Sequence, residues 1–244
     1  MEYLEMLSRL GLGSAHPGGF SETVEQFTKF PLAADSSILE VGCGTGRTAC
    51  YLAEQGYRVT AVDLHPQMVV KAKRRAEQLG VTVDFRQADA HALPFDDQSF
   101  DALLVESVTN FTQAPVSVAE YYRVLKPGGV LYNREMFVKP SAAKEILKDI
   151  QEFFGMPQIL TQPQWTDLMT ASGFERIEML EVQEITDEKL EKQHDQPDQY
   201  QWMDEGVILD FSLLECGIRS SQLISENREH LEYGIMRAFK GGEE

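Results

Sequence analysis

The sequence of 244 residues lacks an excess of positive charge, since 22 lysine and arginine residues stand against 39 acidic residues. The resulting formal net charge of −17 argues against a nucleic-acid backbone and against an anionic membrane surface as partners. The sequence also lacks a run of 18 apolar residues and a basic, apolar leader. We therefore expect a cytoplasmic protein without a membrane partner.

Cysteine is scarce as well. Cys43, Cys50 and Cys216 are odd in number and do not have the spacing of metal ligands, so we expect reduced thiols and no metal site. The sequence shows neither a Ser–His–Asp nor a Cys–His arrangement. Chemistry that needs a nucleophilic side chain on the protein is therefore not indicated.

Glycine, in contrast, is concentrated in one informative stretch. Residues 38–41 form a short apolar run with one acid, which is typical of a buried parallel strand. Gly42, Gly44 and Gly46 then alternate with small residues, and helix-favouring residues follow. A strand, a glycine turn and a helix bring the backbone and the helix N-terminus close to a nucleotide.

The spacing of these glycines indicates which nucleotide is bound. A dinucleotide-binding G-x-G-x-x-G motif would require a third glycine at position 47, where the chain has Arg47. The motif reads E-x-G-x-G-x-G instead, with Glu40 at the end of the strand. A carboxylate there repels a pyrophosphate and suits a cationic ligand such as S-adenosyl-L-methionine (SAM).

Four blocks of sequence resemble class I SAM-dependent methyltransferases, and most closely the branch of the ubiquinone/menaquinone and sterol methyltransferases. The blocks fall in the expected order at residues 38–46, 61–68, 87–101 and 120–131. The resemblance implies SAM as cofactor, S-adenosyl-L-homocysteine as product, and a cofactor site formed by Glu40, Gly42, Cys43, Gly44, Thr45, Gly46, Asp63, Leu64, Met68, Asp89 and Ala90.

Two acids in this set have expected roles. Asp63 ends the second strand, where a carboxylate can accept both ribose hydroxyls, and Leu64 would lie against the adenine. The family places an acid at the position of Asp89 to accept from the adenine amino group. Asp89 acting only as a turn cap is the alternative.

The fold expected is an α/β, Rossmann-like class I methyltransferase fold with a seven-stranded, mostly parallel sheet. The last strand is antiparallel, helices cover both faces, and a helical cap is added. We expect one domain, 1–244, made of an N-terminal helical lid (1–35), a SAM-binding core (36–139) and a C-terminal part (140–244) with a helical insertion (186–228). Ser21 is predicted to cap the second helix, and the basic face of residues 71–75 to be solvated.

His16 and Glu106 are the candidate catalytic residues. His16 lies in a glycine-flanked loop, either as a surface side chain or as a base held in a lid. Glu106 leaves the carboxyl end of the fourth strand, either solvated or facing the sulfonium and the acceptor. The acceptor region would be bounded by Glu106, Ser107, Asn110, Arg134 and Glu135. Aromatic wall residues are expected among Phe20, Phe111, Tyr121, Tyr122, Phe153, Phe154 and Trp202.

Methyl transfer from SAM is a displacement on carbon, so the protein mainly has to align the two molecules and accept a proton. The function predicted is methyl transfer to a small-molecule acceptor. A SAM-binding protein without transfer activity is the alternative, because a fold does not determine a function. Arg47 and Glu40 disfavour an NAD-dependent oxidoreductase. The sequence does not indicate an oligomeric state.

Overall fold

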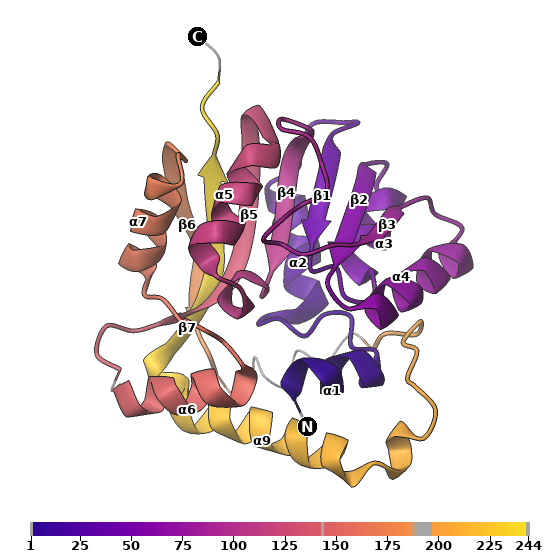
Figure 1. Cartoon of the computed structure of the whole chain (residues 1–244), viewed down its shortest axis with the longest axis vertical. Coiled ribbons are helices and arrows are strands. Elements are labelled where there is room, and N and C mark those ends of the chain that lie inside the picture. Colours follow the sequence, from indigo (N-terminus) through magenta and orange to yellow (C-terminus); the bar gives the residue numbers. More distant parts are fainter. Residues whose placement is uncertain (1, 143, 187, 189–196, 243–244) are drawn as a thin grey trace.

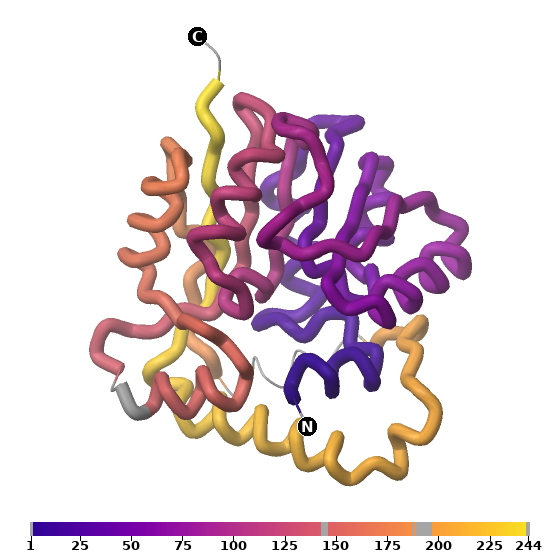
Figure 2. Tube along the Cα trace, in the orientation of Figure 1, coloured from indigo at the N-terminus to yellow at the C-terminus, as the bar shows by residue number. Residues whose placement is uncertain are grey.

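The computed structural model describes residues 2–142, 144–186, 188 and 197–242 and shows a sheet with helices around it (Figures 1 and 2). The elements in chain order are α1 (Tyr3–Leu10), α2 (Gly19–Lys29), β1 (Ser37–Val41), α3 (Arg47–Glu54), β2 (Arg58–Asp63), α4 (Pro66–Leu79), β3 (Asp84–Gln87), β4 (Phe100–Glu106), η1 (Thr109–Phe111), α5 (Ala114–Val124), β5 (Leu125–Val138), α6 (Lys144–Phe154), α7 (Gln162–Ala171), β6 (Arg176–Glu184), η2 (Val207–Leu209), α9 (Phe211–Asn227), η3 (Arg228–His230) and β7 (Leu231–Phe239).

The seven strands lie in the order β3-β2-β1-β4-β5-β7-β6. All pairs from β3 to β5 are parallel, whereas β7 runs antiparallel to both β5 and β6. The order reverses direction at β1, and ligands of open α/β sheets bind at such a point, outside the carboxyl ends of the strands. The predicted fold class is confirmed.

Alternate side chains of the central strands enter two separate cores because the sheet is covered on both faces. On one face, Leu39, Leu103 and Leu131 pack with residues of α5 and α7. On the other face, Ile38 and Leu104 pack with residues of α2, α3 and α4. These strands read as nearly continuous apolar runs for that reason.

A third group of helices covers the edge of the sheet where the parallel strands end. Figure 1 shows α6 and α9 crossing below this edge, with α1 between α9 and the strands. Met6 of α1 is buried with Leu213 and Cys216 of α9, so the two ends of the chain meet in the cover. Within the described residues, no helix has both the length and the apolar character needed to cross a membrane.

The predicted insertion, residues 186–228, contains η2 and α9; its residues 187 and 189–196 lie outside the described part of the chain. The Ser21 cap was wrong. Helix α2 begins two residues earlier, at Gly19, because Gly18 adopts a left-handed conformation (φ 84°) and serves as its N-cap.

The prediction of a solvated basic face on α4 was correct for Lys73 and Arg74, which are exposed, and wrong for Lys71 and Arg75, which are buried. The buried ammonium of Lys71 donates to the Ser8 carbonyl of α1 (2.5 Å) and pairs with Asp204 (2.7 Å). The buried guanidinium of Arg75 forms a bidentate pair with Asp198. Helix α4 therefore anchors both α1 and the segment 197–204, and its cations are buried by chain that comes from both ends.

This arrangement predicts that Arg75→Gln detaches the segment 197–204. The substitution leaves the carboxylate of Asp198 without its cation, and loss of one member of a buried pair costs about 3 kcal/mol. Hydrogen exchange in residues 197–204 should accelerate strongly. Lys73→Gln, on the solvent side of the same helix, is the matched control and should exchange like the wild type. Unchanged exchange in Arg75→Gln would contradict the anchoring role.

Candidate functional site

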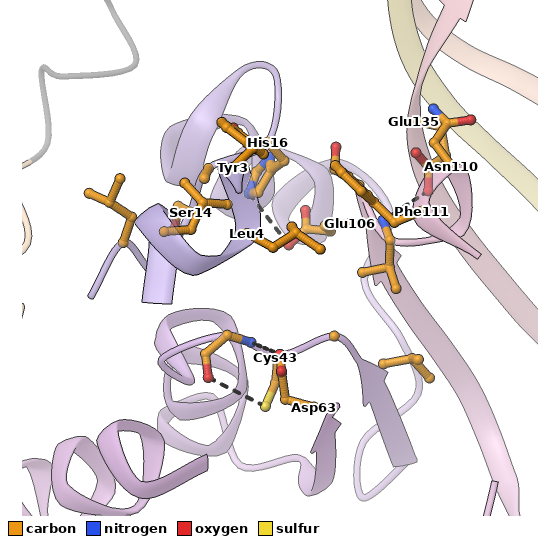
Figure 3. A pocket seen from close by; sticks show the side chains of 18 of the residues that line it. Tyr3, Leu4, Ser14, His16, Cys43, Asp63, Glu106, Asn110, Phe111 and Glu135 are labelled. Atoms are coloured by element: carbon orange, nitrogen blue, oxygen red, sulfur yellow. Dashed lines mark hydrogen bonds and ion pairs between the residues drawn. The ribbon is translucent and has the colours of Figure 1, made fainter. Parts of the chain in front are cut away.

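A cavity of about 530 Å³ lies between the carboxyl ends of β1, β2, β4 and β5 and the covering helices. Strand ends and the loops after them form its floor, while α1 and α9 contribute Leu4, Leu7 and Ile224 to its roof. Figure 3 shows Cys43 and Asp63 at one end, Asn110, Phe111 and Glu135 at the other, and His16 with Glu106 between them.

The glycine turn after β1 forms one end of the cavity. The amides of Gly42 and Cys43 both donate to the Val62 carbonyl (2.8 and 2.9 Å), which holds the turn against β2. Gly42 has φ 73°, and a Cβ at this position would lie 2.2 Å from Val108. A larger residue would push the turn out of place, so the turn requires glycine here on both counts.

Glu40 and Asp63 bring negative charge to this end. Glu40 is buried, and its Oε2 has no hydrogen-bond partner among the described residues. Burial raises the pKa of Glu40 well above its usual range, and the nearby carboxylates of Glu106 and Asp63 raise it further. A buried, unpartnered carboxylate oxygen in a cavity wall fits a ligand with positive charge and N–H donors, as SAM has.

Asp63 is fixed by two backbone donors. Its Oδ2 accepts from the Gly44 amide and its Oδ1 from the His65 amide, both at 2.8 Å. Burial raises the pKa of Asp63, while these two amides lower it. The carboxylate thus joins the glycine turn to the end of β2 and lies in the cavity wall.

The remaining predicted cofactor residues divide into two groups. Leu64, Met68, Asp89 and Ala90 line the cavity, and Leu64 is 65% exposed. Thr45 and Gly46 do not: the Thr45 hydroxyl is bonded to Arg75 (3.1 Å).

Asp89 holds a turn in this structure. Its Oδ1 accepts from the His91 amide (2.9 Å) and contacts His91 Nδ1 (2.7 Å). The His91 amide and ring lower the pKa of Asp89, although partial burial opposes this. The predicted turn cap is therefore present, and the carboxylate also lines the cavity, so an adenine-binding role stays a prediction.

The structure brings the two candidate catalytic residues together. His16 Nε2 lies 3.6 Å from Glu106 Oε2, and both side chains are about 95% buried. His16 Nδ1 lies 3.2 Å from the Pro17 carbonyl, and Nε2 lies 3.4 Å from the Thr23 hydroxyl. Burial lowers the pKa of His16, although Glu106 opposes the shift. The surface alternative for His16 and the solvated alternative for Glu106 are both wrong.

Glu106 is kept ionised by its neighbours. Its carboxylate accepts from the hydroxyls of Thr23 (2.8 Å) and Thr48 (3.2 Å) and from Arg134 Nε (3.3 Å). Burial raises the pKa of Glu106, but His16, Arg134 and the two hydroxyls lower it by more, to below its ordinary value.

Of the residues predicted to bound the acceptor region, Glu106, Ser107, Asn110 and Glu135 line the cavity. Arg134 lies beneath it and pairs with Glu22 of α2 (2.9 Å). Of the predicted aromatic residues, only Phe111 and Phe154 line the cavity. The side chains outside the lining are those of Phe20, Tyr121, Tyr122, Phe153 and Trp202.

The predicted lid and the predicted insertion both contribute wall residues that the sequence analysis did not name. Tyr3, Leu4 and Leu7 come from α1, which lies within the predicted lid. Ser220, Ser221 and Ile224 come from α9. Nothing in their spacing distinguishes a cavity wall from a core face.

No cluster of three or more metal-binding side chains occurs within the described residues.

A family model described as a methyltransferase domain matches residues 39–133. The uncharacterized methyltransferase YodH of Bacillus subtilis is 38% identical over 180 residues, 74% of this chain and 77% of that protein.

Two further similarities extend this picture. The demethylmenaquinone methyltransferase of Thermus thermophilus is 41% identical over 113 residues, 45% of this chain and 51% of that protein. The structure of a Haemonchus contortus phosphoethanolamine N-methyltransferase with bound SAM is similar at a TM-score of 0.75 and 20% identity, over 98% of this chain and 57% of the other. The chain thus belongs to the class I SAM-dependent methyltransferases, and SAM is its cofactor.

Proposed function

We propose that this methyltransferase acts on a small-molecule acceptor that carries no negative charge. The observation that carries the proposal is the composition of the cavity wall. Five acids line it (Glu40, Asp63, Asp89, Glu106 and Glu135), and no lysine or arginine is among its described lining residues. A phosphate or carboxylate on the acceptor would meet this field without a compensating cation.

Enclosure supports a small acceptor. The cavity continues from the glycine turn to an apolar end formed by Tyr3, Phe111, Phe154, Met156 and Ile185. A pocket of this size that is mostly apolar with a few polar groups suits a compact organic molecule. The Haemonchus enzyme is named for a phosphorylated acceptor, and we propose a different acceptor class for this chain.

The cofactor-binding roles are as follows. Glu40 faces the cationic methionine part, Asp63 accepts from the ribose hydroxyls, and Asp89 accepts from the adenine amino group beside Leu64. SAM supplies an activated methyl group on a good leaving group. The protein's part is alignment of the acceptor and exclusion of water by the lid of residues 1–35 above the core of residues 36–139.

His16 is the proposed proton acceptor. The buried, neutral imidazole can take a proton from the acceptor, and the ionised Glu106 stabilises the imidazolium that results. We further propose that the protein acts in the cytoplasm, where its three free thiols stay reduced, and that its acidic charge excludes nucleic-acid partners.

Release of S-adenosylhomocysteine from methyl-labelled SAM, with the label recovered in a small hydroxyl- or amino-bearing compound, tests the transfer. Tight SAM binding without label transfer to any compound of a broad panel would instead favour a SAM-binding protein without transfer activity.

Asp63→Asn should weaken SAM binding by about 1.5–3 kcal/mol, because it removes the charge from a carboxylate proposed to accept two hydroxyls. Isothermal calorimetry measures the change. Asp84→Asn, on exposed β3, is the matched control and should bind like the wild type. Equal affinity for SAM in both variants would rule out the ribose role of Asp63.

His16→Gln should lower turnover about 100-fold or more while SAM affinity changes little, because glutamine keeps the size but cannot take a proton. Burial lowers the pKa of His16, so the wild-type rate should be flat near pH 7 and fall as the pH drops below about 6.5. This acid limb should be absent from His16→Gln.

His230→Gln is the control, since His230 lies outside the cavity wall. Wild-type turnover in His16→Gln, or an unchanged acid limb, would make His16 a bystander.

A further inference from the structure

Glu135 of β5 is a buried carboxyl group with one oxygen in use. Its Oε1 accepts from the amides of Val108 (3.0 Å) and Thr109 (2.7 Å), which fixes the start of η1. Its Oε2 has no hydrogen-bond partner in the part of the chain that the structure describes. Glu135 is fully buried from solvent yet lines the cavity.

A second oxygen in the same wall also lacks a hydrogen-bond partner. Asn110 of η1 donates from Nδ2 to the Met136 carbonyl (2.9 Å), which sets the orientation of its amide. Its Oδ1 is then left without a partner among the described residues. Figure 3 shows Asn110 and Glu135 next to each other, at the end of the cavity away from Cys43 and Asp63.

Holding η1 does not explain either oxygen. The two backbone amides occupy Oε1 alone, and the Met136 carbonyl occupies only the amino group of Asn110. Leaving a buried polar atom unpaired is unfavourable, and an apolar tip at either position would avoid that cost. The surrounding wall is apolar, with Phe111, Met136 and Met156, so a hydrogen-bond donor on a ligand in the cavity would supply the partner that these oxygens lack.

We propose that Glu135 and Asn110 determine acceptor specificity by selecting a largely apolar molecule that presents a hydroxyl or amino group to these two oxygens. The inference rests on the proposed function and names the acceptor class of the same site. The acceptor side of the cavity would then have two polar positions. His16 with Glu106 accepts the proton, and Glu135 with Asn110 forms an anchor that binds the hydroxyl or amino group.

The chemistry of the two oxygens restricts the ligand group. Burial raises the pKa of Glu135 to about 8, so this carboxyl can donate as well as accept near neutral pH. Asn110 Oδ1 can only accept. A ketone, an ether, a carboxylate or a phosphate cannot donate to Asn110, whereas a hydroxyl or an amino group satisfies both oxygens.

A matched series on one flat apolar scaffold tests this: 2-naphthylamine, 2-naphthol, 2-methoxynaphthalene and 2-naphthoate. Binding of each to the protein loaded with S-adenosylhomocysteine is measured by calorimetry at neutral pH. The amine and the naphthol should bind at least about tenfold more tightly than the ether, and the naphthoate should bind least. An ether or naphthoate that binds as well as the donors, or no binding by either donor, would overturn the proposal.

Glu135→Gln removes the acceptor capacity of one atom, which in the wild type can both accept and donate. The glutamine oxygen still accepts from the two η1 amides, while its amino group replaces Oε2 by a donor. The arylamine, which donates well and accepts poorly, should lose about tenfold in affinity. The naphthol, which can do both, should lose less, and the ether, which only accepts, should not lose affinity.

Glu120→Gln is the matched control, because Glu120 also accepts from a backbone amide, that of Leu93, but lies outside the cavity wall. It should keep the wild-type ranking. A wild-type ranking in Glu135→Gln as well, with intact near-ultraviolet dichroism, would overturn the anchor. The affinity for S-adenosylhomocysteine, measured in the same titrations, distinguishes a failure of the proposed function from a failure of the anchor. If the wild type does not bind S-adenosylhomocysteine, the cofactor site is contradicted. If it binds S-adenosylhomocysteine but does not rank the naphthalene compounds as expected, only the anchor is contradicted.

Discussion

The ion pairs of the buried Arg134 guanidinium are the interactions that hold helix α2 and the His16 loop over the cavity. It is 1% exposed and lies between Glu22 of α2 and Glu106 of β4, with the Gln26 amide oxygen as a further partner (3.1 Å). A buried cation is costly unless its donors are used, and the two carboxylates together compensate the charge and occupy donors of the guanidinium. The pairing therefore fixes α2 on the end of the sheet, and with it the preceding loop that carries His16.

The same arrangement explains why the cavity stays acidic. Arg134 pairs with Glu22 outside the cavity wall. Lys71 and Arg75 of α4 bind Ser8 of α1 and Asp198, so they do not face the cavity either. Glu40 lines the cavity without a counter-charge, and burial raises its pKa. We propose that the positive charge of SAM compensates it. The electrostatics of the protein are thus complementary to SAM, and they disfavour a second anion beside it.

The sequence predicted those parts of the site that are formed by residues close together in the chain. The glycine turn and Asp63 each follow a strand directly, and their environment depends on a few neighbouring residues and one parallel pairing. His16 and Glu106 could be paired because a lid and a strand end leave little other space. The buried state of Lys71 and Arg75 could not be predicted, because it depends on Asp198 and Asp204, far along the chain. For the same reason Phe20, which packs on Arg47 and Tyr51, was mistaken for a wall residue.

The meeting of α1 and α9 in the cover has a consequence for biosynthesis. Helix α1 is synthesised before the strands and α9 after β1 to β6, so the parallel strands and the glycine turn can assemble before α9 is made. Until then Met6 of α1 lacks its partners Leu213 and Cys216, and the cavity lacks the part of its roof that α9 supplies. A nascent chain would therefore leave the cavity partly open to water, and the order of translation delays closure of the site until α9 has been synthesised.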